Sequence, residues 1–370
     1  MKVRLGNYIK EYSVRNKKDE DIPVFSVTNT QGFCQDYFGK EVASKDKTTY
    51  KIVPRGCFAF NPSRINVGSV DWQRNEERVI VSPLYNVFSV SEQLDQQYLY
   101  YYLKSDFALQ RIRAVATGSV RDNLKLAMLY EFPIELPEIT EQRIIVDKLD
   151  RVKQIISLRE KEVQALDDLI KARFVEMFGD PVANPKGWET YQLNDCLKWI
   201  DNGKSFVCSD KPRGGDYPAV LKLSAATYGD YRPEENKALL DENQFVEGAE
   251  VHAGDLLFTR KNTPELVGMA AYVHETPERL MMPDLIFRLV TNDRMNPVFL
   301  WQLINCKEFR PIIQGISGGS AKSMSNISKE RLGRINVICP PRQIQDQLVP
   351  FAHQVDKSKQ AREYSGKLAA

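Results

Sequence analysis

"ATGSVRDNLKLAMLYEFPIELPEITEQRIIV", residues 116–146, has a counterpart in "SGGSAKSMSNISKERLGRINVICPPRQIQDQLV", residues 317–349. Both stretches run in the same order: a loop of small residues, a polar helix start, a short apolar strand, a proline and then a glutamine, Gln142 or Gln345. The second copy has two extra residues in its loop. A spacing of about 200 residues is far longer than the 20–50 residues of solenoid repeats. The sequence therefore predicts a duplicated whole domain.

The duplication extends upstream of these stretches. "YKIVPRGCFAFNPSRINVGSV" (50–70) matches "EVHAGDLLFTRKNTPELVGMA" (250–270), with a turn glycine, an apolar strand, a polar loop and then Val-Gly in both. "QYLYYYLKSDFALQRIR" (97–113) matches "VFLWQLINCKEFRPIIQ" (298–314), and each is predicted to form one amphipathic helix.

One long helix is predicted between the two copies. From Ile145 to about Phe178 the apolar residues step by alternating fours and threes, which is the heptad spacing of a coiled-coil seam. The prolines and glycines of "FGDPVANPKGW" (178–188) end it. The second copy begins its own helix with the same steps, so we expect the two helices to pair in antiparallel orientation. The seam residues are Leu149, Val152, Ile156, Val163, Leu166 and Ile170, and in the second copy Ile344, Leu348, Phe351 and Val355.

The predicted fold class is α+β, with two pseudo-twofold-related globular domains separated by a long antiparallel helix pair. The expected boundaries are 1–137 for the first domain, 138–180 for the central helix, 181–340 for the second domain and 341–370 for a shortened distal helix. The final "KLAA" (367–370) looks like sequence left by an expression vector and is excluded from the reasoning about the fold.

Composition restricts the classes of function. The chain has 370 residues, 42% hydrophobic and 27% charged, and a formal net charge of +2, which neither requires nor excludes a nucleic-acid partner. No apolar run approaches the roughly 18 residues of a membrane span, and the N-terminus lacks a signal-peptide core, so we expect a cytoplasmic protein. The six cysteines include no CxxC pair and the three histidines are far apart, so we expect reduced thiols and no metal site.

Signatures of catalysis are mostly absent. Counting from Gly315, a phosphate-binding P-loop would need glycine and lysine where Ser320 and Ala321 stand. "FNPSR" (60–64) is weakly similar to the Asn-Pro-Pro-aromatic motif of amino-methyltransferases, but Ser63 and Arg64 replace its last two residues. We predict no catalytic residue, although a dispersed catalytic site stays open at this point.

The whole arrangement resembles the DNA-specificity (S) subunit of Type I restriction–modification systems. The resemblance rests on the order of globular domain, Pro-x-x-x-x-Gln and long helix, repeated twice across the chain. It is densest in the second half, in "NGKSF" (202–206), "YPAVLKLSAATYGDY" (217–231), "GDLLFTRKNTPELVG" (254–268) and "SGGSAKSMSNIS" (317–328). The short terminal helix departs from the family pattern.

The resemblance implies a non-catalytic subunit. Each domain would read one half of a bipartite target in double-stranded DNA. The helices would space the halves and dock two methyltransferase (modification) subunits, which carry S-adenosylmethionine. Restriction and translocase subunits, which use ATP and Mg²⁺, would join the same assembly. No cofactor is expected on this chain.

Candidate DNA contacts follow from the chemistry of base edges, because Arg and Lys pair with guanine while Asn and Gln pair with adenine. The candidates in strand-end loops are Asn61 and Arg64 in the first domain and Arg260, Lys261 and Asn262 in the second, followed by Lys204, Ser205 and Lys222. For Ser320, Lys322 and Ser323, beside Gly318 and Gly319, we expect contact with DNA phosphate. The alternative for this last segment is a glycine-rich turn and helix cap.

Other residues are interpreted as structural. Gln142 and Gln345 are predicted to organise the helix junction and the docking face for the partner subunit. Tyr100, Tyr101 and Tyr102 are interpreted as helix packing rather than base stacking. Two rival functions stay open: an enzyme with its own methyltransferase or nuclease site, and an adaptor whose domains bind no DNA.

Overall fold

The computed structural model describes residues 2–35, 46–116, 123–318 and 324–369, except for the side chains of 360–369. The chain divides between Ile155 and Ile156 into two units, here called unit 1 and unit 2. The long helix α4, Ile139–Phe178, crosses this division, so its first half belongs to unit 1 and its second half to unit 2. The boundaries expected from the sequence had set this helix apart as a segment of its own.

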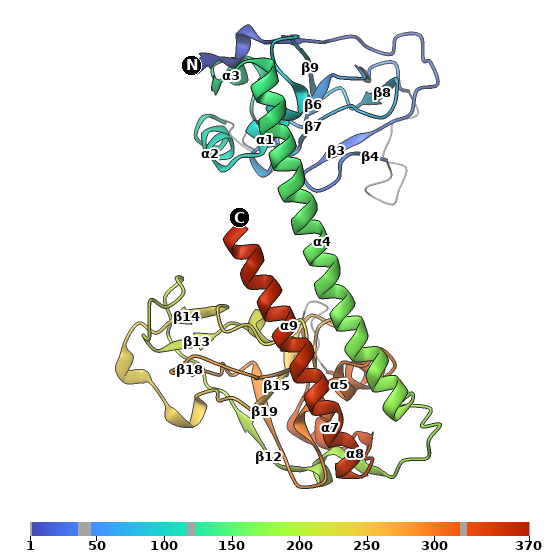
Figure 1. Ribbon diagram of the computed structural model, residues 1–370, viewed down its shortest axis with the longest axis vertical. Coiled ribbons are helices and arrows are strands. Elements are labelled where there is room, and N and C mark those ends of the chain that lie inside the picture. Colours follow the sequence, from blue (N-terminus) through green and yellow to red (C-terminus); the bar gives the residue numbers. More distant parts are fainter. Residues whose placement is uncertain (1, 36–45, 117–122, 319–323, 370) are drawn as a thin grey trace. The chain divides into compact units, whose positions relative to one another are not determined.

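The elements of unit 1 before α4 are β1 Lys2–Arg4, β2 Ile9–Glu11, β3 Ser26–Thr28, β4 Gly32–Cys34, β5 Lys51–Pro54, β6 Phe58–Phe60, β7 Val70–Trp72, β8 Arg78–Val81, β9 Asn86–Val90, α1 Gln96–Lys104, α2 Asp106–Val115, α3 Leu126–Tyr130 and β10 Pro133–Glu135. Its main sheet is antiparallel, with the strand order β2-β9-β6-β7 (Figure 1). Successive side chains of a strand point to opposite faces. Phe58 and Phe60 of β6 therefore join the core beneath the helices, whereas Ala59 joins a second core on the other face.

The elements of unit 2 after α4 are β11 Thr190–Gln192, β12 Leu197–Asn202, β13 Ala219–Leu221, β14 Asn236–Ala238, β15 Leu256–Thr259, β16 Lys261–Asn262, β17 Ala270–Tyr272, β18 Leu280–Met281, β19 Ile286–Thr291, α5 Pro297–Asn305, α6 Arg310–Gly315, β20 Ser325–Asn326, α7 Lys329–Gly333, β21 Asn336–Ile338, α8 Arg342–Asp346 and α9 Leu348–Ala369. Its main sheet has the order β12-β19-β15-β17. Leu256 and Phe258 face the helices, and Leu257 faces the opposite core, as in unit 1.

The two units repeat one plan. The series β1, β2, β6, β7, β9, α1, α2, α3 and β10 recurs as β11, β12, β15, β17, β19, α5, α6, α7 and β21, with matching sheet order and matching β1–β10 and β11–β21 pairs. The paired glycines expected from the sequence also agree. Gly68 and Gly268 have φ of +90° and +74°, a region that favours glycine, and a Cβ on Gly268 would lie 2.2 Å from Ile313 Cγ2. The predicted domain duplication is confirmed.

The helices predicted at 97–113 and 298–314 are each broken in two, and this part of the prediction is wrong. Ser105 has an extended ψ of 151°, and its hydroxyl accepts a hydrogen bond from Ala108 N, so it ends α1 and caps α2. Cys306 ends α5 with an extended ψ of 132°. The amphipathic pattern continues across both breaks because the second helix in each unit buries an apolar residue, Ile112 or Ile313, in the same core.

The tyrosines of α1 are packing residues, as interpreted. Tyr102 Oη donates to the Pro133 carbonyl at 2.7 Å, and Tyr101 Oη donates to Asp150 on α4. The ammonium group of Lys153 lies 4.8 Å from the centre of the Tyr101 ring. These contacts fix the first turns of α4 against unit 1.

In each unit one buried glutamine joins the globular part to the helix that follows it. Gln142 Oε1 accepts from the Asp95 backbone N–H at 2.8 Å, and its Nε2 donates to the carbonyls of Gln93 and Pro137, both at 2.9 Å. Asp95 is the residue that caps α1. The side chain of Gln142 has no exposed surface. One side chain thus ties the start of α1 to the start of α4.

Gln345 makes the same three contacts in unit 2. Its Oε1 accepts from the backbone N–H of Asn296, the cap of α5, at 2.8 Å. Its Nε2 donates to the carbonyls of Arg294 at 2.9 Å and Pro340 at 2.6 Å. It too is fully buried, so neither glutamine side chain offers a surface to a partner subunit. Both glutamines form the junction between the unit and the following helix, and they can affect partner docking only by positioning that helix.

In unit 2 the second half of α4 and α9 form the expected antiparallel pair (Figure 1). Leu348 and Ala352, at the start of α9, share a core with Phe174 and Phe178 at the end of α4. Further along α9, Lys359 contacts Asp167, which lies earlier in α4 than Phe174. The two helices therefore run in opposite directions. Lys359 Nζ lies 2.6 Å from Asp167 and 2.8 Å from Asp230. Burial works to lower the pKa of Lys359, but the two carboxylates outweigh it and raise the pKa, so the buried charge stays paired.

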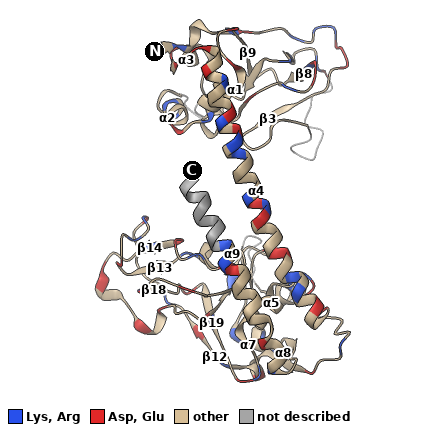
Figure 2. Ribbon diagram, viewed as in Figure 1, with Lys and Arg blue, Asp and Glu red and all other residues tan. Residues whose placement is uncertain are grey.

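The heptad seam of α4 is covered unevenly. Ile170 is 4% exposed, whereas Leu149 and Ile156 are 38% and 36% exposed. Figure 2 shows both signs of charge along α4, and neighbouring turns pair them, as in Arg151–Asp147 and Arg173–Glu176. Such exposed pairs contribute little to stability, but they keep a partly uncovered helix soluble.

The glutamine junction generates a stability prediction. Gln345→Ala removes three hydrogen bonds and leaves the buried N–H of Asn296 without its acceptor, which should cost about 1–3 kcal/mol. Urea unfolding followed by fluorescence measures this cost. The matched control is Gln343→Ala, on the same helix but exposed. Equal unfolding midpoints for the two variants would contradict the role given to Gln345.

A second prediction concerns His274, which packs against α9. Its ring centroid lies 4.8 Å from that of His353, and its Nε2 lies 4.0 Å from Asp356. Burial, with smaller contributions from the nearby His353 and Lys359, lowers the pKa of His274 to about 4, although Asp230 opposes them. An unfolded histidine has a pKa of about 6.5, so between these two values the unfolded chain binds a proton that the folded chain does not.

Unit 2 should therefore lose stability as the pH falls from about 6.5 toward 4, and His274→Gln should reduce that loss. The measurement is the urea midpoint at about pH 7 and about pH 5, followed by the fluorescence of Trp301, whose ring lies 5.8 Å from His274. His252→Gln, at an exposed histidine, is the control. An unchanged pH dependence in His274→Gln would exclude His274 as its source.

Candidate nucleic-acid interface

In unit 2 the loop that begins at Arg260, after β15, lies beside residues 325–327, at the end of the small-residue segment 317–328. Lys261 pairs with Asn326, and Asn262 pairs with Ser325, in the short β16–β20 ladder. The Ile327 N–H donates to the Arg260 carbonyl at 2.8 Å. Two segments that were singled out separately for DNA contact are therefore joined. Ser320, Lys322 and Ser323 lie outside the described residues, so their predicted phosphate contact stays a prediction.

Arg260 is held in a defined orientation at this junction of loops. Its guanidinium carbon lies 5.1 Å from the centre of the Phe287 ring, and Nε and Nη2 donate to Asn326 Oδ1 at 3.4 and 3.3 Å. The side chain is half-buried. No hydrogen bond of Nη1 is found among the described residues, so this donor is available to an acceptor from outside, such as guanine O6 or a phosphate oxygen.

Asn262 has a different environment. It is 7% exposed, its Nδ2 donates to Thr227 Oγ1 at 3.2 Å and its Oδ1 accepts from the Thr263 N–H at 2.8 Å. It holds the loop in shape, and its burial argues against direct reading of a base. Its predicted DNA contact stays untested, as does that of its half-buried neighbour Lys261.

Lys204 and Ser205 reach the same end of unit 2. The Lys204 N–H donates to the Met282 carbonyl at 3.2 Å, and the Arg260 N–H donates to the Leu285 carbonyl at 3.0 Å, so both loops flank the segment 283–286. A Cβ on Gly203 would lie 1.9 Å from the Pro283 carbonyl oxygen, which explains the glycine in "NGKSF". The side chains of Lys204 and Ser205 are exposed.

Lys222 is not part of this group. Its ammonium group lies 3.4 Å from Glu235 Oε2, which also accepts from Ser224 Oγ at 2.8 Å. The hydrogen bond from Ser224 and then the charge of Lys222 lower the pKa of Glu235. Among the described residues nothing links the Lys222 ammonium group to the Arg260 loop.

Unit 1 repeats the joined loops with other side chains. The Leu124 N–H donates to the Pro62 carbonyl at 3.1 Å, as Ile327 donates to Arg260 in unit 2. Ser63 Oγ donates to Asn123 Oδ1 at 2.6 Å, and Asn61 Oδ1 accepts from the Ser63 N–H at 3.0 Å. Pro62, not Arg64, thus occupies the place of Arg260.

Arg64 is exposed, and its guanidinium contacts no described residue by hydrogen bond or ion pair. Both units have a basic residue in the loop after this strand, Arg64 in unit 1 and Arg260 in unit 2. The two arginines stand at different positions of the loop, because the loop of unit 2 is two residues longer. Arg64 is therefore free to bind an anion but is not pre-oriented as Arg260 is.

Sequence reasoning missed three polar residues at these sites. Asn123 and Asn326 stand opposite each other in the aligned repeats, and that alignment was the available signal. Lys329, whose ammonium group lies 5.7 Å from the centre of the same Phe287 ring as Arg260, donates to the Ile200 carbonyl. Its counterpart in unit 1 is Leu126, so the repeat gave no signal for it.

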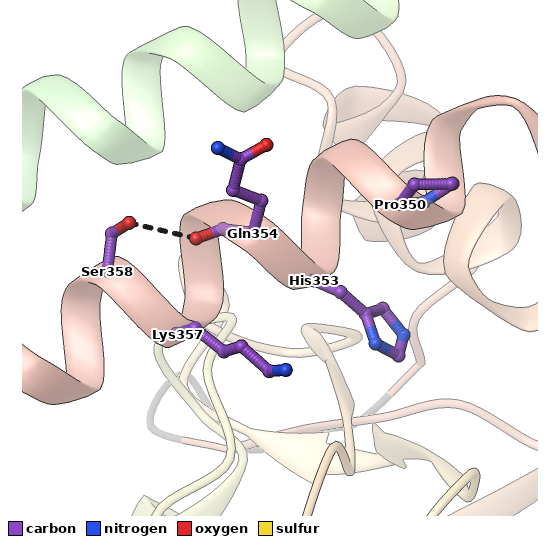
Figure 3. Close-up of a pocket in the computed structure, with 5 residues that line it drawn as sticks. All are labelled: Pro350, His353, Gln354, Lys357 and Ser358. Atoms are coloured by element: carbon purple, nitrogen blue, oxygen red, sulfur yellow. Dashed lines mark hydrogen bonds between the residues drawn. The ribbon is translucent and has the colours of Figure 1, made fainter.

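Two hollows lie elsewhere in the units. One, of about 470 Å³, runs along a face of α9 and is lined by Pro350, His353, Gln354, Lys357 and Ser358 (Figure 3). Another, of about 600 Å³ in unit 1, has the basic residues Arg15, Lys17 and Lys18 on its wall. The described residues contain no cluster of three or more His, Cys, Asp or Glu side chains suited to a metal ion. Within that same part of the chain, no helix is both long and apolar enough to span a membrane.

Comparison with known proteins agrees with this arrangement. A family model described as the type I restriction modification DNA specificity domain matches residues 2–167 and 185–365. The chain belongs to this family of type I restriction–modification DNA specificity proteins.

Two relatives from Escherichia coli are specificity subunits of type I restriction enzymes. The EcoEI subunit is 29% identical over 206 residues, which are 55% of this chain but only 33% of that protein. The EcoKI subunit of strain K12 is 23% identical over 348 residues, 87% of this chain and 75% of that protein. The chain thus spans a third of the first relative and three quarters of the second.

Two solved structures share the fold. The S subunit of a type I restriction–modification system from M. genitalium matches with a TM-score of 0.53 and 14% identity, covering 100% of this chain and 92% of its own. A chain from a type I system solved to explain complex assembly and conformational transition matches with a TM-score of 0.55 and 19% identity, covering 100% and 94%.

Proposed function

We propose that this chain reads a bipartite DNA target, one half with each unit, and brings modification subunits to it. The observation that carries the proposal is the loop pair that occurs in both units: a strand-end loop, at 61–64 or 260–262, bonded to the end of the small-residue segment, at Asn123 or Asn326. Membership of the DNA-specificity family supports DNA as the ligand of this repeated surface.

The division of labour follows from the differences between the two loops. Arg260, which lies over the Phe287 ring, has the geometry to read guanine through the adjacent Nη2 and through Nη1, which bonds to no described residue. In unit 1 the corresponding loop offers the amide of Asn61 and the exposed guanidinium of Arg64. Different side chains on one scaffold give two halves of different sequence, which is what a split target requires.

The chain acts without catalysing a reaction itself. Methyl transfer belongs to two modification subunits, which hold S-adenosylmethionine, and cleavage belongs to restriction and translocase subunits that use ATP and Mg²⁺. The relatives described above are named as specificity subunits. Exposed apolar residues on α4, such as Ile155 at 52% and Leu158 at 58%, supply surface on which subunits can dock.

The reading role predicts a defect restricted to one half-site. In the complex with modification subunits, Arg260→Ala should remove a guanidinium contact worth about 1–3 kcal/mol of discrimination at one base pair. The other half-site should keep its preference. Arg64→Ala should do the reverse. The measurement is the sequence of DNA selected by each complex from a library randomised in both halves.

The control is Arg334→Ala, at a 72% exposed arginine that directly follows α7 and pairs with Glu330. It removes the same charge from unit 2 and should leave both preferences unchanged. If Arg260→Ala selects the same sequences as Arg334→Ala, Arg260 does not read a base.

A further inference from the structure

Asn123 and Asn326 occupy the same place in the two units. Each directly precedes a fully buried apolar residue, Leu124 or Ile327. The N–H of that residue donates to the carbonyl of the strand-end loop, at Pro62 or Arg260. The backbone of both asparagines is therefore fixed against the loop by the core.

The side chains of the two asparagines do equivalent work with different partners. Asn123 Oδ1 accepts from Ser63 Oγ at 2.6 Å, and Asn326 Oδ1 accepts from Arg260 Nε and Nη2 at 3.4 and 3.3 Å. In each unit one amide oxygen thus bonds to a side chain of the loop proposed to face DNA. The partner changes from serine to arginine, but the asparagine does not change.

The contact matters most for Arg260, because an arginine has many rotamers and must lose them on binding DNA. The Phe287 ring, 5.1 Å from the guanidinium carbon, restricts the position of the group but offers no directional hydrogen bond to set its rotation. Two bonds to one oxygen remove this rotation and leave Nη1 unbonded within the described residues. The bonds are long, so the tether orients the group without binding it tightly.

We propose that Asn123 and Asn326 are positioning residues for half-site reading, one in each unit. Each acts through a neighbour: Asn326 orients the Arg260 guanidinium before DNA arrives, and Asn123 holds Ser63 and with it the 61–64 loop. Pre-orientation raises discrimination because less conformational freedom is lost on binding. This inference rests on the proposed DNA-reading function.

The test uses the chain assembled with its modification subunits and a DNA library randomised in both halves. Asn326→Ala should reduce the base preference of the unit 2 half-site by roughly three- to ten-fold, with unit 1 unaffected and affinity for unrelated DNA within about two-fold of the parent. Asn326→Asp keeps an acceptor oxygen and should keep the preference. Its added negative charge should instead weaken binding to all DNA.

A parallel experiment covers unit 1. Asn123→Ala and Ser63→Ala should each alter the half-site read by unit 1, and the double variant should be no worse than Asn123→Ala alone, since that change already removes the bond to Ser63. For Asn326→Ala in unit 2 the matched control is Asn336→Ala, at an exposed asparagine of β21.

Three outcomes would overturn the inference: unchanged preferences in Asn326→Ala, an equal loss of affinity for all DNA with unchanged preferences, or a loss of preference in Asn326→Asp as large as in Asn326→Ala. A parent complex that selects no sequence in either half would instead refute the proposed function.

Discussion

The structure depends on a fully buried glutamine that joins each recognition unit to the helix leaving it. A primary amide offers one acceptor oxygen and two donor hydrogens. Gln142 and Gln345 use all three on backbone groups, so each buried side-chain amide is fully hydrogen-bonded. A buried amide with incomplete bonding would be costly, so the junction is stable only in this geometry. This geometry sets the position of α1 relative to the start of α4 in unit 1, and of α5 relative to the start of α8 in unit 2.

A fixed junction leaves the opposite end of each unit free to vary. The order of the main sheet and the positive-φ turn glycines Gly68 and Gly268 are the same in both units, whereas the strand-end loops differ in length and in chemistry. Unit 1 has Pro62 and an exposed Arg64 where unit 2 has an oriented Arg260. The scaffold tolerates these changes because the bonds that define the loop end are backbone bonds, from Leu124 to Pro62 and from Ile327 to Arg260. The duplicated fold can therefore carry different side chains, and so different specificities, in its two copies.

The sequence predicted the repeat well because repeats are encoded in local order: glycine turns, apolar strands and the Pro-x-x-x-x-Gln spacing. It could not show contacts between residues that are distant in the sequence. Asn262 looked available, but Thr227, 35 residues earlier, binds its amide. Arg64 looked equivalent to Arg260 until the backbone bonds showed the shift of register. The breaks at Ser105 and Cys306 were hidden because apolar periodicity continues through them. Lys329 aligns with Leu126 of the first repeat, so no matching lysine indicated its importance.

The central claim is that two units of one design read two separate blocks of DNA sequence. The most direct measurement is a genome-wide map of methylated adenines in cells that carry the modification subunit with and without this chain. The account predicts methylation only when the chain is present, at a bipartite motif whose two specified blocks are separated by an unspecified spacer of constant length. A single continuous motif, or a motif that does not depend on the chain, would contradict it.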